Sequence, residues 1–278
     1  MRFTSATQLK DWIKNITKRT GTPANVLLKT YFMERLLERI SVSSYRDNMI
    51  LKGGFLIAAM TGIDKRNTKD MDATAIGLPL SFDIINGIMN EIISLDVCDD
   101  VSFEVVKISN IRDSGDHEDF RILLKARFHS ISDFLKFDIT VGDIIVPQEI
   151  EYQYKLLFEN RTIPVMAYNL YTILAEKIEA ILSRNISNSR ARDFYDVYML
   201  LSLYSDMISR NELLEALKIK AVERGSLAYI ENYAELLNDI STSPEIAAIW
   251  DGYVRAFSYA NDIKLVDIIS IIRWVFDD

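Results

Sequence analysis

One segment constrains this chain more than any other, because it joins an apolar run, two glycines and two closely spaced aspartates. The run Met49–Lys52 is followed by Gly53 and Gly54, and a basic turn then leads to Asp70 and Asp72. This order predicts a strand, a tight turn, a short helix and a second strand. Residues two apart on a strand leave the same face, about 7 Å apart at Cα. Both carboxylates are therefore predicted to point to one place.

Two carboxylates held together in this way need a cation. At 4 Å they repel by about 4 kcal/mol in an effective dielectric near 20, and a divalent ion turns this repulsion into attraction. Two ions about 3.5–4 Å apart activate the attacking hydroxyl and steady the triphosphate in nucleotidyl transfer. With two histidines and one cysteine in the chain, a zinc site is not expected. Asp70 and Asp72 are therefore predicted to hold Mg²⁺, or Mn²⁺, through oxygen.

The two glycines suit the other half of such a site. Bare backbone at Gly53 and Gly54 lets N–H groups approach phosphate oxygens, and a helix N-terminus favours negative charge. Lys52 and Arg66 add cations nearby, and Arg66 is expected to contact phosphate or to brace the aspartates. A D-x-D alone is usually a polar turn or an exposed strand face, and G-G alone is usually a turn. The combination is much more selective than either part.

This combination resembles nucleotidyltransferases of the DNA polymerase β type, which carry an apolar residue, a glycine pair, a short helix and D-x-D or D-x-E. Leu51–Gly54 together with Arg66–Asp72 is similar to the AbiEii/AbiGii toxin family, with its L-K-G-G-T-A-L and R-x-S/T-x-D-L-D motifs. The chain departs from the pattern at Phe55, where a small hydroxyl residue is usual, and in a longer loop after Gly62. The resemblance implies that NTP is the substrate and that Thr68 belongs to its binding site.

A third carboxylate is sought on a neighbouring strand, where the resemblance implies one. Asp138 lies in the apolar stretch Leu135–Val141 and by alternation shares a face with Lys136 and Thr140. An unpaired carboxylate buried there would be costly, so a ligand role fits it. The alternative is an exposed strand aspartate on the solvent face. Asp143, beside a glycine, is expected to be a turn residue.

A second motif lies further along, in two predicted helices. Lys177 and Arg184 are seven apart and share a helix face, and Asp193 and Asp196 are three apart and share another. On spacing alone, a structural ion-pair cluster in which Arg184 and Arg192 tie the helices together is favoured. The resemblance instead assigns Lys177 and Asp193 to the catalytic site, with Lys177 on the triphosphate. Arg192 and Asp196 stay structural.

The wider pattern predicts an α+β fold: a polymerase-β-like domain with a mixed sheet and flanking helices, then an all-helical C-terminal domain. The predicted domains are residues 1–165, with N-terminal helices, and 166–278. The helix starts are predicted at Thr22-Pro23 and Asn169, where a hydroxyl or amide caps the helix. His117 is expected in a polar loop. The predicted helices are 55–60 and 81–93, and the predicted strands are Val101–Ser109, Phe120–Phe128 and Leu135–Val141.

Composition limits the partners. The net charge of −8 argues against general nucleic-acid coating, although a local basic groove is compatible with it. No apolar run reaches the roughly 18–20 residues that span a bilayer, and the single cysteine fits a reducing compartment, so no membrane partner and a cytoplasmic location are expected. Cations to test for an RNA-facing patch are Lys14, Lys18, Arg19, Lys65, Arg184 and Arg190.

The resemblance also implies a biological setting. It implies the toxin half of a bacterial toxin–antitoxin or phage-defence pair, with a cognate antitoxin encoded alongside. It implies an RNA acceptor such as tRNA, which nothing in the residues selects. Two alternatives stay open: a non-catalytic nucleotide-binding or partner-binding protein on the same fold, and an enzyme that nucleotidylates protein.

Overall fold

The computed structural model describes residues 2–111 and 119–277, so His117 lies outside the described residues. The chain divides into two compact units, here called the sheet unit and the helical unit. The sheet unit comprises Met1–Asp143 and Glu149–Ala167, and the helical unit comprises Ile144–Gln148 and Tyr168–Asp278. The domain border predicted near residue 165 stays a prediction, and residues 144–148 group with the helical unit.

The elements of the sheet unit are helices α1 (Ala6–Thr20), α2 (Ala24–Val42), α3 (Gly53–Thr61) and α4 (Phe82–Ser94), and strands β1 (Met49–Lys52), β2 (Asp70–Ala75), β3 (Val101–Asn110), β4 (Phe120–Phe128), β5 (Ile131–Val141), β6 (Ile150–Lys155) and β7 (Thr162–Ala167). The elements of the helical unit are α5 (Leu170–Arg184), α6 (Ala191–Tyr204), α7 (Arg210–Glu223), α8 (Leu227–Glu231), α9 (Tyr233–Thr242), α10 (Pro244–Ala256) and α11 (Leu265–Arg273), with short 3₁₀ turns between some of them. In the described chain, no helix is long and apolar enough to cross a membrane.

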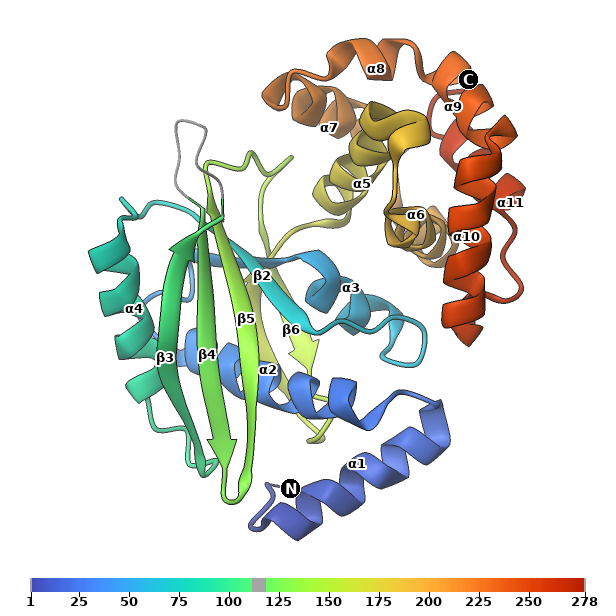
Figure 1. The fold of residues 1–278 in the computed structure, drawn as a ribbon. Helices are drawn as coiled ribbons and strands as arrows, with labels where there is room; N and C mark the ends of the chain where they lie inside the picture. The colour runs from blue at the N-terminus through green and yellow to red at the C-terminus, as the bar shows by residue number, and fades with distance from the viewer. Residues whose placement is uncertain (1, 112–118, 278) are drawn as a thin grey trace. The chain divides into compact units, whose positions relative to one another are not determined.

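The strands form one mixed sheet in the order β3-β4-β5-β2-β1-β7-β6. β2 runs parallel to β5 and β1 runs parallel to β7, whereas the other neighbouring pairs are antiparallel. α2 packs against β5 and β7, and α4 packs against β3. In Figure 1, β3, β4 and β5 face the viewer and α2 passes behind them. The predicted mixed sheet with flanking helices, followed by a helical C-terminal region, is confirmed.

Alternation gives β4 and β5 one buried face and one open face. The buried face is apolar because it packs on the helix side, where it loses contact with water. Its fully buried members are Phe120, Ile122, Leu124, Ala126, Phe128, Leu135, Phe137 and Ile139. The opposite face carries charged and polar residues, and this face holds the candidate site.

The two predicted helix starts have different outcomes. Asn169 caps α5, and its side chain accepts a hydrogen bond from the Thr172 N–H at 2.9 Å, as predicted. The predicted hydroxyl cap of α2 is wrong, because α2 begins at Ala24 with Pro23 as its cap and without a side-chain cap bond. The Thr22 hydroxyl donates instead to the Ile63 carbonyl at 3.3 Å. The helix starts one residue later than the Thr-Pro pattern predicts.

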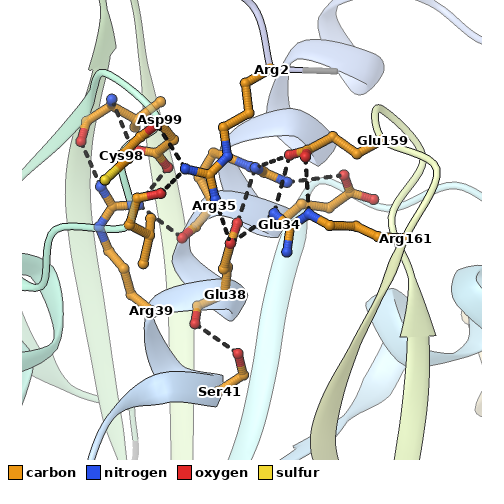
Figure 2. A network of polar contacts seen from close by, with 12 residues as sticks. Arg2, Glu34, Arg35, Glu38, Arg39, Ser41, Cys98, Asp99, Glu159 and Arg161 are labelled. Carbon is orange, nitrogen blue, oxygen red and sulfur yellow. Dashed lines mark hydrogen bonds and ion pairs between the residues drawn. The ribbon is translucent and has the colours of Figure 1, made fainter.

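α2 carries a buried network of ion pairs (Figure 2). The Arg39 guanidinium donates to both carboxylate oxygens of Asp99 at 2.7 and 2.8 Å, which fixes α2 to the start of β3. Arg35 pairs with Glu38 at 3.0 Å and with Glu159, which lies between β6 and β7. Because each charge is buried with a partner, the network positions α2 against distant parts of the sheet unit.

Burial of the Glu34 carboxylate lowers the free energy of unfolding by an amount that depends on pH. Its Oε1 accepts from the Leu157 N–H at 2.7 Å, and burial raises the pKa of its carboxyl to about 7. Between the ordinary pKa of 4.5 and about 7, the folded chain binds more protons than the unfolded chain. The free energy of unfolding therefore falls as pH rises through this window.

Glu34→Gln, which resembles the protonated carboxyl, should remove this pH-dependent destabilisation. We expect it to raise the free energy of unfolding by roughly 3 kcal/mol at pH 8 and to have little effect near pH 4.5. Urea unfolding of both proteins at several pH values measures this, with Glu215→Gln on the exposed face of α7 as the control. A difference between Glu34→Gln and the original chain that does not change with pH contradicts the assignment.

Candidate active site

Asp70 and Asp72 lie on β2, with both side chains on the open face of the sheet. Asp70 is exposed and Asp72 is half-buried, whereas Met71 and Ala73 between and beyond them are buried on the opposite face. The strand period of two therefore separates carboxylates from core side chains along a few residues. The result is an acidic pair at the start of a central strand.

The sheet register brings Asp138 to this pair. β2 and β5 are parallel neighbours, and the Cα partner of Asp72 is Asp138. Side chains that lie side by side in neighbouring strands share a face. Asp70, Asp72 and Asp138 are thus on the same face, and Asp138 lies next to Asp72.

Arg121 on β4 binds Asp138 and lies within the electrostatic field of Asp70 and Asp72. It is the register partner of Asp138, and its Nε and Nη2 atoms donate to the two carboxylate oxygens at 2.9 and 2.7 Å. The pKa of the Arg121 guanidinium is raised by this hydrogen bonding, by the charge of Asp138, and further by the charges of Asp70 and Asp72. A single guanidinium therefore lies in the electrostatic field of the whole acidic group. Arg121 is absent from the sequence prediction, because only the register of β4 and β5 places it there.

Gly53 lets the Asp72 carboxylate lie against the start of α3. A Cβ atom at residue 53 would stand 2.2 Å from Asp72 Oδ2, and the backbone there has φ +69°. Both facts require glycine, since other residues rarely adopt this conformation and any side chain would strike the carboxylate. Lys52 and Asp72 are register partners on β1 and β2, so the strand pairing sets this approach.

Gly54 serves a different neighbour. A Cβ atom there would stand 3.0 Å from Arg66 Nη2 and 3.1 Å from Thr68 Oγ1. Arg66 is buried. The Thr68 hydroxyl donates to the Asp70 carbonyl at 3.3 Å and accepts from the Asp70 N–H at 3.4 Å. Arg66 also donates to the Asn67 carbonyl, so both side chains lie in the turn that leads into β2. The role of Arg66 at phosphate or beside the aspartates stays a prediction.

Lys52 takes part in a polar cluster that sequence reasoning missed. Its ammonium group donates to Thr140 Oγ1 at 2.5 Å and forms an ion pair with Asp143. The hydroxyls of Thr74 and Thr140 also donate to Asp143. Burial opposes ionisation of Asp143, but the Lys52 charge and these hydrogen bonds hold the pKa of its carboxyl below the usual range. Asp143 is not the turn residue that the sequence predicts, because it follows β5 without forming a turn, and its side chain holds Lys52 beside the glycine pair.

Lys177 and Asp193 meet in the helical unit. The Lys177 ammonium group on α5 pairs with Asp193 and, at 3.2 Å, with Asp196, both on α6. Arg184 lies 3.4 Å from Asp193. This is the kind of ion-pair cluster that the spacing favoured, with Lys177 in it and Arg192 exposed. The role of Lys177 and Asp193 in catalysis stays a prediction.

The donor set of the sheet unit suits a hard cation, because its carboxylates are the oxygen ligands that Mg²⁺ prefers. Among residues 2–111 and 119–277, no group of three or more His, Cys, Asp or Glu side chains is arranged to hold a metal ion by itself. Mg²⁺ rarely needs such a cage, since it is usually bound by one or two carboxylates together with substrate phosphates and water. The positive charge next to Asp138 is the Arg121 guanidinium. The carboxylates of Asp70 and Asp72 therefore fit Mg²⁺ as part of a ligand set that phosphate and water would complete.

Comparison with known proteins gives a family and a fold. The model of the family described as "Nucleotidyl transferase AbiEii toxin, Type IV TA system" matches residues 35–274. A crystal structure of a candidate nucleotidyltransferase from Helicobacter pylori is similar with a TM-score of 0.51 and 12% identity, over 90% of this chain and 94% of that one. JHP933 from the same organism is similar with a TM-score of 0.50 and 13% identity, over 90% and 91%. No curated protein matches.

Proposed function

The chain belongs to the AbiEii family of nucleotidyltransferase toxins, and from this premise we propose a metal-dependent enzyme that transfers a nucleotide from an NTP to RNA. The observation that carries the proposal is the gathering of Asp70, Asp72 and Asp138 on one sheet face, within the field of Arg121. An acidic group of this kind costs free energy unless cations offset it. Its position beside a glycine turn at a helix N-terminus supports a role in handling phosphate.

The proposed roles follow from the placement of each side chain. Asp70 and Asp72 would hold Mg²⁺ or Mn²⁺, which supplies charge stabilisation for the triphosphate and its leaving group. Backbone N–H groups of Gly53 and Gly54, at the start of α3 and next to the Asp72 carboxylate, would donate to phosphate oxygens. Asp138 would accept the proton of the attacking hydroxyl, and Arg121 fixes the orientation of its carboxylate.

Other predicted residues have secondary parts in this proposal. Arg66 and Thr68 would keep Asp70 in place, and Lys52 would face phosphate from its position on Asp143. Lys177 is proposed to bind the triphosphate, with Asp193 holding its ammonium group until substrate arrives. The residues in these proposed roles are the ones that the sequence predicted for the site.

The family supplies a setting for this activity. A Type IV toxin–antitoxin family implies an antitoxin partner. We propose that this antitoxin is encoded alongside, that the pair acts in the cytoplasm in defence against phage, and that the acceptor is a tRNA. The acceptor and the setting depend on the family and not on a contact within the structure.

A transfer assay tests the proposal directly. The purified chain is incubated with each α-labelled NTP, Mg²⁺ or Mn²⁺, and either total RNA or total protein of a bacterial host. We expect label on RNA, with no transfer when EDTA removes the metal. Label on protein would show a protein-nucleotidylating enzyme instead, and bound NTP without any transfer would favour the non-catalytic alternative.

A further inference from the structure

The open face of β3, β4 and β5 carries a group of cations, here called the basic face. In Figure 1 this face is turned toward the viewer and α2 lies behind it. Lys107, Arg127 and Lys136 are exposed, Lys125 is half-buried, and the Arg121 side chain is 46% exposed. The members of the basic face are Lys107, Arg121, Lys125, Arg127 and Lys136.

The register arranges these cations in successive rows across the three strands. Arg121 lies beside Asp138, and in the next row Lys107 and Lys136 both lie opposite Leu123. Lys125 and then Arg127 follow at steps of two residues along β4. At about 3.3 Å per residue, the line from Arg121 to Arg127 is about 20 Å long. It begins at the carboxylates of the candidate active site.

Among the residues that the structure describes, four of these cations have no carboxylate partner, whereas the buried arginines of α2 do. Within the part of the chain that the structure describes, Lys107, Lys125, Arg127 and Lys136 form no ion pair. In contrast, Arg35 and Arg39 of α2 are held by buried acids. A chain of net charge −8 has many carboxylates that could offset a cation cluster. One exposed acid, Glu104, shares this face as the register partner of Lys125, and the four cations without an ion pair in the described chain outnumber it. Like charges on one sheet face repel, so this face attracts an external polyanion.

An exposed aromatic side chain lies among the cations. Phe134 on β5 is 48% exposed, and Lys125 Nζ lies 5.9 Å from the centre of its ring. Lys125 and Phe134 are register partners, so the contact follows from the strand pairing. An aromatic ring between cations is the arrangement that binds unpaired bases while cations follow the phosphates. A duplex would keep its bases stacked inside and would leave Phe134 without a role.

We propose that the basic face binds a single-stranded segment of the acceptor RNA and directs its end to Asp138 and Asp72. Phosphates contact Lys107, Lys125, Arg127 and Lys136, and one base stacks on Phe134. This proposal rests on the proposed function for the identity of the reaction, but the binding surface is defined by the sheet alone. It also differs from the helical cations Lys14 and Lys18 that the sequence suggested for RNA contact.

Fluorescence anisotropy of a labelled single-stranded RNA oligonucleotide measures the binding without turnover, in EDTA and without NTP. Lys125→Glu/Arg127→Glu should weaken binding about tenfold or more, and should lower the slope of log affinity against log salt by about 1.4. Phe134→Ala should weaken binding of the single strand about fivefold or more and leave a matched duplex unaffected. The matched control is Lys10→Glu/Arg255→Glu, the same charge change at exposed positions of α1 and α10.

Several results would overturn the proposal. One is an unchanged affinity for RNA in Lys125→Glu/Arg127→Glu, and another is an equal loss of affinity in the control variant. A third is binding of polyglutamate in place of RNA, which would point to an acidic protein partner. If charge reversal lowers the melting temperature, Lys125→Gln/Arg127→Gln gives the same comparison. Because the assay uses no NTP, a failure of the proposed transfer reaction leaves the binding result readable. If the chain transfers label to RNA but these substitutions leave RNA binding unchanged, the RNA-binding role of the basic face is refuted and the proposed function is not.

Discussion

Asp72→Asn should lower the rate of nucleotide transfer by at least about a thousandfold. The substitution keeps the size of the side chain but removes the negative charge that would hold a divalent ion beside the triphosphate. Metal stabilisation of transition-state charge contributes several kcal/mol, and about 4 kcal/mol corresponds to a thousandfold in rate. Initial rates of label transfer at saturating NTP, for Asp72→Asn and the original chain, measure the effect.

The fold should survive this change, since Asp72 shares its sheet face with Asp70 and Asp138 and the substitution relieves repulsion among them. Thermal melting checks this, and Asp251→Asn at an exposed position of α10 is the matched control, expected to leave both rate and melting temperature unchanged. A rate for Asp72→Asn within a few fold of the original would refute the site assignment.

Gly53→Ala should have the second largest effect on activity. The new Cβ atom would stand 2.2 Å from Asp72 Oδ2, so either the carboxylate or the start of α3 must shift. A displacement of this size misplaces the acidic pair relative to the phosphates, and a shift of about 1 Å can cost about a hundredfold in rate. Initial rates of transfer by Gly53→Ala measure the loss.

Two further glycines separate the causes of this effect. Gly21 has a similar backbone, φ +73°, but a Cβ there meets nothing within 4 Å, so Gly21→Ala should cost about 1–2 kcal/mol of stability and no activity. Gly87 lies exposed within α4 with open space around it, so Gly87→Ala should stabilise by about 0.5–1 kcal/mol. If Gly53→Ala loses stability but keeps its activity, as expected for Gly21→Ala, the close approach of Gly53 to Asp72 does not contribute to catalysis.

The sequence by itself determined those features that depend on near neighbours in the chain. The strand β4 is found where alternation predicted it, because buried and exposed side chains must follow the pleat. Helix α5 begins after Asn169, whose side-chain amide oxygen accepts a hydrogen bond from a helix N–H group only three residues away. The spacing of Asp70 and Asp72 likewise predicts that their side chains share one face, because side chains alternate along a strand with a period of two.

Only the tertiary structure decided which distant residues meet. The neighbours of Asp138 depend on β5 pairing with β2 on one side and β4 on the other, and a shift by one residue would turn it to the opposite face. Arg121 owes its place to that register. Asp143 also reads as a plain turn residue until the sheet brings Lys52 and Thr74 to it.

The charges of α2 show the same limit in the core. Glu34, Arg35, Glu38 and Arg39 have the spacing of a solvated helix face, yet all four are buried. Their partners Asp99 and Glu159 come from distant segments, and burial of an ion is tolerable only where such partners exist. Local periodicity thus set the elements and the acidic pair. Strand register and long-range charge pairing, which no local pattern contains, built the site around them.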